Sequence, residues 1–328
     1  MLKVLSLFDG LGGARIALDN LGVECEYYAS EIDKYAIAVA KHNYPDIKEL
    51  GNVNDIQNVK GIDLLIGGSP CQGLSSSGSR LGLEDHRSIL FYEYARIFEN
   101  HRPKYFVLEN VASMKKVDRD IITDILGVEP ILINSSLVTC QNRSRLYWTN
   151  IQGVEQPKDR NIFINDILEE NVESVRYYVT QYFNDAIYEY LSENGGQAIY
   201  SCNRIKALHG ERKVKASALM TALSSVFARQ SQDAVVVLKD KSDTDIDYVN
   251  KNHPLRVHMS DYNGLKSIPN DKQVFLLRCY NTLERERLQG IPEKYTTVDG
   301  ISRMQRNKMI GNGFTIPVIE HILSYMER

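Results

Sequence analysis

The sequence predicts an α/β fold, a doubly wound sheet of parallel strands joined to a smaller second domain. Between residues 1 and about 150, short apolar runs alternate with amphipathic stretches, which is typical of strand–helix units in a parallel sheet. Gly22 and Gly127 stand where helices favour glycine at their ends. After Pro157 this alternation gives way to irregular Tyr- and Asn-rich segments, which indicates a change of architecture.

Five apolar runs in the first half are the predicted strands, and four amphipathic stretches between them are the predicted helices. The strands cover residues 4–8, 26–29, 63–66, 105–108 and 131–133. The helices cover residues 14–21, 34–42, 88–100 and 121–126. Farther along, residues 234–238 have the pattern of a strand, and residues 283–289 and 317–326 that of helices. We expect a first domain at 1–160, a second at 161–275, and a segment at 276–328 that packs back onto the first.

The composition is that of a globular protein from a reducing compartment. Of the 328 residues 43% are hydrophobic, yet no apolar run approaches the ~20 residues that a membrane span needs. Met1 leads directly into the first predicted strand, so we expect a soluble, unprocessed protein. The five cysteines have no paired spacing and form no cluster with histidines, which argues against a disulfide framework and against a metal site.

The charge of the chain does not by itself predict a nucleic-acid partner. The net charge is -3, whereas contacts to phosphate come from Lys and Arg. A local basic cluster between residues 204 and 215 has two interpretations, a phosphate-binding face or a solvated loop. Its members are Arg204, Lys206, His209, Arg212, Lys213 and Lys215.

A glycine-rich turn follows the first predicted strand. The run Phe8-Asp9-Gly10-Leu11-Gly12-Gly13 opens a helix, and glycines there let a ligand approach the backbone closely. Glu31 ends the second strand about twenty residues on, where a carboxylate of a nucleotide-binding α/β fold accepts hydrogen bonds from ribose hydroxyls. Asp55, near the next turn, is placed to accept from an adenine amino group. These residues predict a nucleoside-containing cofactor and leave both NAD and S-adenosyl-methionine open.

A cysteine stands at the carboxyl end of another apolar strand, the edge at which open α/β sheets hold their ligands. It is Cys71, in the run Gly-Ser-Pro-Cys-Gln at 68–72. Glu-Asn-Val at 109–111 ends the next strand, and Gln-Asn-Arg-Ser-Arg at 141–145 precedes another. Because adjacent strand ends converge on one pocket, we expect a nucleophilic thiol with acidic and basic partners. A nicotinamide-dependent dehydrogenase gives no explanation for this set.

The set resembles the motifs of the DNA (cytosine-5) methyltransferases, in which Pro-Cys-Gln, Glu-Asn-Val and Gln-x-Arg-x-Arg occur in this order. The resemblance covers nearly the whole chain, with a mobile loop at 73–80, its following helix at 90–97, the penultimate motif at 284–292 and the last cofactor contact at 311–313. The front half resembles compact bacterial and phage enzymes, and residues 295–319 resemble the animal de novo methyltransferases. Two departures are Gly313, where the family commonly has serine, and the lead into the penultimate motif at 281–283.

The resemblance implies a Rossmann-like methyltransferase that uses S-adenosyl-L-methionine and releases S-adenosyl-L-homocysteine. It implies that Cys71 adds to carbon 6 of a cytosine, that Glu109 acts at N3 and Arg145 at O2, and that Arg143 supports them. It also implies a cofactor site formed at the strand ends and by the last motif. The residues of that site are Phe8, Asp9, Gly10, Gly12, Gly13, Glu31, Ile32, Asp55, Ile56, Pro70, Leu90, Asn312 and Gly313.

Double-stranded DNA is the substrate that the resemblance implies, with the target base flipped out of the helix. The loop at 73–80 should close behind the base, and residues 161–275 should recognise the DNA sequence in the major groove. The residues expected to contact DNA are Ser75, Ser77, Arg80, Gln141, Arg204 and Arg229, with Asn203 and Gln230 as further candidates for reading bases.

An RNA (tRNA) cytosine-5 methyltransferase of the same fold is the alternative, and the long region at 161–275 favours DNA over it. For a member of this family we expect a monomeric protein that binds neither a metal nor a membrane and that is of the kind found in restriction–modification systems. Its place is the cytoplasm of a prokaryotic or phage-infected cell, or the nucleus if the source is eukaryotic.

Overall fold

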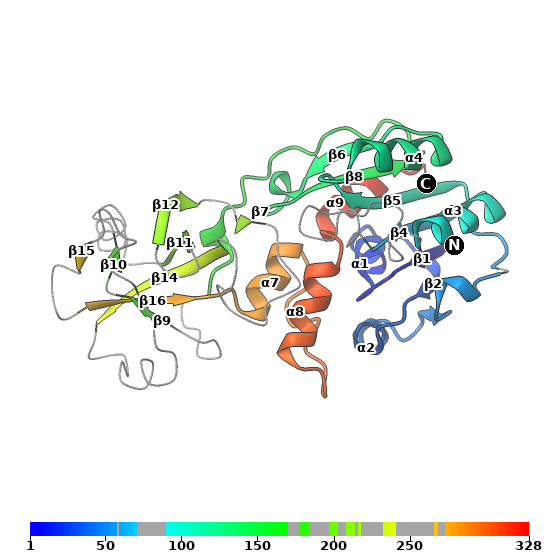
Figure 1. The fold of residues 1–328 in the computed structure, drawn as a ribbon. Coiled ribbons are helices and arrows are strands. Elements are labelled where there is room, and N and C mark those ends of the chain that lie inside the picture. The colour runs from blue at the N-terminus through cyan, green and yellow to red at the C-terminus, as the bar shows by residue number, and fades with distance from the viewer. Residues whose placement is uncertain are drawn as a thin grey trace.

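Figure 1 shows the computed structural model, in which an α/β part holds both ends of the chain and a set of strands lies beside it. Residues 1–57, 59–70, 90–169 and 279–327 are described, together with the backbone of the strands between residues 178 and 278. Cys71 and the loop at 73–80 lie outside the described residues, as do Arg204 and Arg229.

The α/β part is built on a seven-stranded sheet with the order β3-β2-β1-β4-β5-β8-β6. Its strands are β1 (Leu2–Leu7), β2 (Cys25–Ser30), β3 (Lys48–Glu49), β4 (Leu64–Gly68), β5 (Tyr105–Val111), β6 (Ile131–Asn134) and β8 (Ser144–Thr149). All five predicted strands are present with small shifts of their bounds. Every neighbouring pair is parallel except that β8 runs antiparallel to β5 and β6. The five predicted strands all run in the same direction, and β8 runs the other way because the stretch between β6 and β8 is too short to hold a crossover helix.

Helices cover both faces of the sheet and enclose two apolar cores. One core includes residues of α1 (Gly13–Asn20), α2 (Lys34–Asn43) and α9 (Ile316–Leu323), and the other includes residues of α3 (Leu90–His101) and α4 (Lys116–Leu126). Neighbouring strand residues serve opposite cores, since Val4 packs into the first and Leu5 into the second. The predicted helices are confirmed, although α4 begins at Lys116, earlier than expected.

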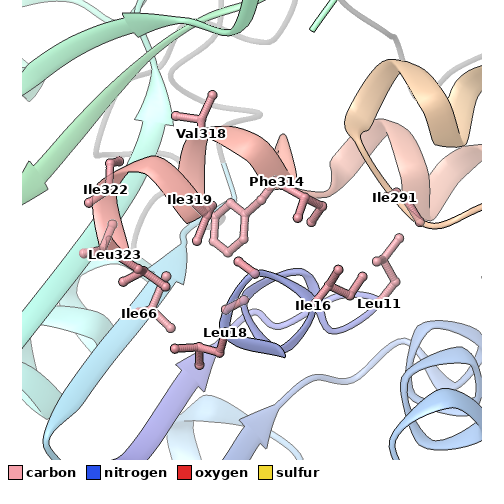
Figure 2. Close-up of a cluster of buried hydrophobic side chains, with 14 of the residues drawn as sticks. Leu11, Ile16, Leu18, Ile66, Ile291, Phe314, Val318, Ile319, Ile322 and Leu323 are labelled. Carbon is pink, nitrogen blue, oxygen red and sulfur yellow. The ribbon is translucent and has the colours of Figure 1, made fainter. Parts of the chain in front are cut away.

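The C-terminal segment returns to the first face of the sheet. It contains α7 (Thr282–Gln289), α8 (Arg303–Asn312) and α9. Figure 2 shows Ile322 and Leu323 of α9 beside Ile66 of β4 and Leu18 of α1. Helix α8 was not predicted, because its sequence RMQRNKMIGN lacks an apolar stripe. Its start is fixed by a capping box between the backbone and side chains of Ser302 and Gln305.

The second part of the chain is an antiparallel sheet with the order β12-β11-β14-β16-β9. Its strands are β9 (Tyr178–Thr180), β11 (Gln197–Cys202), β12 (Leu208–Lys213), β14 (Gln232–Asp240) and β16 (Gln273–Arg278). Strand β14 contains the predicted strand at 234–238, and the predicted boundary at residue 275 falls inside β16. Two short strands pair separately, β10 (Tyr182–Phe183) with β15 (Lys266–Ser267).

One short pair of strands joins the two parts. Strand β13 (Ala216–Ser217) pairs in parallel with β7 (Gln141–Asn142), which comes directly before Arg143 and β8. Backbone hydrogen bonds thus connect the polar segment at 141–145 to a strand that lies between β12 and β14 in the sequence.

Candidate active site

Strands β5 and β8 bring an acidic and a basic side chain together. Arg145 Nε lies 2.9 Å from Glu109 Oε1, and both side chains are largely buried, with exposed fractions of 15% and 13%. Strand pairing explains the contact, because Val111 of β5 is the direct partner of Arg145 on β8. The structure thus brings together two residues that the sequence placed on separate strands.

The end of β4 lies against this pair and leads into Cys71. Gly68 is the register partner of Glu109, and a Cβ at Gly68 would lie 3.1 Å from Glu109 Oε2. Only glycine leaves the carboxylate this room. Asn110 Nδ2 donates to Ser69 Oγ at 3.1 Å, which ties the next residue of β4 to β5 as well. Pro70, one residue before Cys71 in the sequence, follows this fixed point.

The glycine turn after β1 is tied to the carboxylate that ends β2. Gly10 N–H donates to Glu31 Oε2 at 2.8 Å, while Oε1 accepts from the backbone N–H groups of Ile32 at 2.7 Å and Asp33 at 2.8 Å. Three donors therefore hold the Glu31 carboxylate at the edge of the sheet. Ile32 beside it is 75% exposed, an apolar side chain that faces solvent. A carboxylate fixed beside an apolar surface suits a ribose and its attached base.

Two further carboxyl groups lie behind the glycine turn. Asp9 is 5% exposed and its Oδ1 accepts from the Tyr27 hydroxyl at 2.6 Å. Among the described residues Asp9 Oδ2 and both carboxylate oxygens of Glu49 have no hydrogen-bond partner. Burial raises the pKa of Asp9 to about 6, and burial together with the charge of Asp9 raises the pKa of Glu49 to about 7. Sequence reasoning missed Glu49, because a two-residue edge strand carries no periodic signal.

The other arginine of the 141–145 segment, Arg143, points to the C-terminus of α8. Arg143 is 5% exposed, and its guanidinium donates to the carbonyls of Gly311 at 3.4 Å and Gly313 at 3.3 Å. Phe314 follows this turn. Its ring lies 3.4 Å from the position of a Cβ at Gly13 and 3.1 Å from that of a Cβ at Gly68. The turn at 311–313 therefore stands next to the glycine turn and to the end of β4.

Two sequence predictions do not fit the structure. Gln141 was expected to contact DNA, but its side chain is fully buried and its amide donates to Leu288 O at 3.0 Å and Gln289 Oε1 at 3.2 Å. Ile56 was expected at the cofactor, but its side chain is 4% exposed within an apolar core, and its carbonyl accepts from Arg96 at 3.0 Å. Asp55, one residue earlier, is exposed and free to meet a ligand at the strand ends.

A tyrosine that the sequence did not single out supports the glycine turn. The Tyr295 hydroxyl donates to Leu11 O at 2.8 Å, and its oxygen lies 3.3 Å from the position of a Cβ at Gly12. No local pattern identifies this residue, because its contact is with a segment 284 positions away. Within the described residues no group of three or more His, Cys, Asp and Glu side chains is placed to hold a metal ion. None of the helices described is long and apolar enough to cross a membrane.

Comparison with protein families matches nearly the entire chain. The model for C-5 cytosine-specific DNA methylases covers residues 2–328. The type II methyltransferase M.HpaII of Haemophilus parainfluenzae is 26% identical over 96% of this chain and 86% of its own length. The orphan methyltransferase M.Rho11sI of Bacillus phage rho11s is 40% identical over 44% of this chain, and that of phage SPR 39% over 46%. These two alignments span about a third of the phage enzymes, 32% and 38%.

Solved structures of low sequence identity share the fold over the full length of the chain. The Entamoeba histolytica methyltransferase EhMeth superposes with a TM-score of 0.66 at 16% identity, covering 99% of this chain and 97% of its own. The DNMT2 of Spodoptera frugiperda gives a TM-score of 0.63 at 19% identity, with 99% of both chains covered. A putative DNA modification methyltransferase of an Escherichia coli prophage gives 0.56 at 18%, covering 99% and 98%.

Proposed function

Because this chain belongs to the family of C-5 cytosine-specific DNA methylases, we propose that it methylates carbon 5 of a cytosine in double-stranded DNA. The observation that carries the proposal is the contact between Glu109 and Arg145 beside the strand end that leads into Cys71. A carboxyl group and a guanidinium in contact can bind N3 and O2 of one pyrimidine edge.

The chemistry begins with the thiolate of Cys71, which forms a bond to carbon 6 of the cytosine. The electrons of the 5,6 double bond move toward N3, where Glu109 supplies a proton, and Arg145 stabilises the charge at O2. Carbon 5 then carries the electron pair that takes the methyl group. Return of the N3 proton to Glu109, loss of the carbon 5 proton and departure of the thiolate restore the aromatic ring. A base inside a duplex cannot reach these groups, so the cytosine must be flipped out.

S-adenosyl-methionine supplies an electrophilic methyl group when it is bound, and the residues present fit it. Glu31, already held by three N–H donors, would accept the ribose hydroxyls, and the exposed side chain of Ile32 would cover the adenine. Asp55 would accept from the adenine amino group. The turn at Asn312 and Gly313 would form the far wall, next to the glycine turn.

The covalent step gives the decisive experiment. With 5-fluorocytosine at the target position, fluorine replaces the proton that must leave, so the enzyme should stay bonded to the methylated base. We expect a complex that survives a denaturing gel, requires S-adenosyl-methionine and disappears in Cys71→Ser, because a hydroxyl is a far weaker nucleophile at neutral pH. Cys279→Ser serves as the matched control and should keep the trap. Trapping in Cys71→Ser would overturn the nucleophile, and trapping on RNA alone would overturn the substrate.

The cluster of Lys and Arg at 204–215 is proposed as a phosphate-binding face. Each phosphate contact contributes about -0.9 to the slope of log affinity against log salt concentration. Neutralising the cluster should make this slope shallower for duplex DNA, as measured by fluorescence anisotropy. An unchanged slope would place the DNA-binding face elsewhere. The variant would change Arg204, Lys206, Arg212, Lys213 and Lys215.

We further propose that the protein acts as a monomer in the cytoplasm of a bacterial or phage-infected cell. The curated relatives that support this setting come from Haemophilus and from Bacillus phages. Sedimentation of the protein with and without duplex DNA tests the monomer, and a constant dimer mass would contradict it.

A further inference from the structure

A buried polar network joins three distant segments of the chain at Gln289. The Gln289 side chain is fully buried, and its Oε1 accepts from Gln141 Nε2 at 3.2 Å and from Thr315 Oγ1 at 2.8 Å. Its Nε2 donates to Ile310 O at 2.9 Å and lies 3.5 Å from Gly313 O. One amide group at the end of α7 thus contacts β7, the end of α8 and the start of α9.

The network completes a helix end whose capping glycine is not left-handed. Helix α7 ends in Gly290 at φ 69°, a left-handed residue, whereas α8 ends in Gly313 at φ -70° and ψ 168°, which is extended backbone. The last carbonyls of a helix lack partners within it and need donors from elsewhere. For α8 the Gly313 N–H donates to Met309 O at 3.0 Å and Ile310 O at 3.3 Å, and side chains supply further donors: the amide of Gln289 toward Ile310, and the guanidinium of Arg143 toward Gly311 and Gly313.

The turn so held lies at the carboxyl edge of the sheet. Phe314, directly after it, packs between Gly13 of the glycine turn and Gly68 of β4 (Figure 2). A buried network whose members are all hydrogen-bonded restricts its segments to one arrangement. Asn312 lies between Gly311 and Gly313, whose carbonyls Arg143 contacts, and Gln289 reaches Ile310 O on the same turn.

We propose that Gln289 is a positioning residue for the cofactor, which fixes the turn at 311–313 as a wall of the S-adenosyl-methionine pocket. This inference rests on the proposed function. If Gln289 positions the cofactor site, cofactor affinity should depend on the hydrogen bonds of Gln289. If Gln289 only stabilises the core, cofactor affinity should follow protein stability.

The test compares Gln289→Met with the triple variant Gln141→Met, Gln289→Met, Thr315→Val. Gln289→Met keeps the volume but leaves Thr315 without its acceptor and Gln141 with fewer, so the melting temperature should fall. The triple variant replaces all three polar side chains with apolar groups of similar shape, so much of that loss should be recovered. Titration calorimetry should nevertheless show S-adenosyl-methionine bound about tenfold more weakly by both variants, since neither has the side-chain donor toward Ile310 O.

A second variant keeps the test decisive if the apolar variants do not fold. Gln289→Glu, compared at pH 8 in its ionised form, retains the shape and both accepted hydrogen bonds and places a carboxylate oxygen, which cannot donate, toward Ile310 O. We expect weaker cofactor binding and faster amide hydrogen exchange over residues 309–315, with unchanged affinity for duplex DNA. Cofactor affinity that recovers together with the melting temperature in the triple variant, or wild-type affinity in Gln289→Glu, would overturn the inference.

Cofactor binding by the wild-type protein distinguishes failure of the proposed function from failure of the role of Gln289. If it binds no S-adenosyl-methionine, the proposed function fails. If it binds the cofactor and all three variants bind equally well, the proposed function stands and the role of Gln289 fails alone.

Discussion

The glycine that ends α7 is the position at which the smallest substitution should have the largest effect on stability. Gly290 has a φ of 69°, and a Cβ added there would lie 2.3 Å from Cδ and 2.7 Å from Cγ of Pro317. Both atoms belong to a rigid ring at the start of α9. Gly127, which ends α4, offers a matched control, because its φ is 70° but no atom lies within 4 Å of its added Cβ.

The two substitutions to alanine share one cost and differ in another. A left-handed conformation costs a residue with a Cβ about 1–2 kcal/mol, and this applies at both sites. Overpacking adds about 1–3 kcal/mol, and it applies only at Gly290, where α9 must move away from α7. We therefore expect the free energy of unfolding to fall by about 1–2 kcal/mol in Gly127→Ala and by about 2–5 kcal/mol in Gly290→Ala.

Urea denaturation followed by circular dichroism measures both changes. The slope against urea should stay that of the wild type, and the midpoint should move further in Gly290→Ala. Equal losses in the two variants would show that the contact between Gly290 and Pro317 is not rigid. That result would refute the packing of α9 against the end of α7.

Three further predictions concern the site. Glu109→Gln should lower the rate of methyl transfer by about 100-fold or more while duplex affinity, by anisotropy, stays near wild type, because it removes a proton donor and not a groove contact; an unchanged rate would exclude Glu109 from the chemistry. Glu31→Ala should weaken S-adenosyl-methionine binding in calorimetry, whereas Glu24→Ala, at the exposed start of the same strand, should not; equal affinities would move the ribose site. The raised pKa values of Asp9, about 6, and Glu49, about 7, mean that the folded protein holds protons that the unfolded chain releases, so wild-type stability should fall as the pH rises from about 4 to about 7. Asp9→Asn and Glu49→Gln should flatten this fall in urea titrations at pH 5 and pH 8, and parallel curves for variant and wild type would refute it.

Sequence reasoning predicted most of the α/β part, because its signals are local. Apolar runs and amphipathic spacing gave β1, β2, β4, β5 and β6 and the helices between them. The partners Glu109 and Arg145 were also predictable, because residues at adjacent strand ends must converge. The short strand β3 and the polar helix α8 were missed, since a two-residue strand carries little apolar signal and α8 has no apolar stripe.

The features that sequence reasoning missed depend on contacts between distant segments. Gln141 has the chemistry of a residue that contacts DNA, and only the fold shows that its amide is used by Leu288 and Gln289. The contact of Tyr295 with Leu11 likewise joins segments 284 positions apart. Ile56 was expected to contact the cofactor, yet its side chain is part of the apolar core that α3 covers.

The parallel pair of β13 and β7 has a consequence for exchange of the second domain between relatives. Only three positions separate Asn142, which pairs with Ser217, from Arg145, a span of about 10 Å along an extended chain. A graft of residues 161–275 from another member of the family must therefore bring its own two-residue strand to this edge, in the same register. A graft that lacks it would remove the backbone pairing at the start of the 141–145 segment, and Arg145 would be aligned less firmly even if the new DNA sequence were bound tightly.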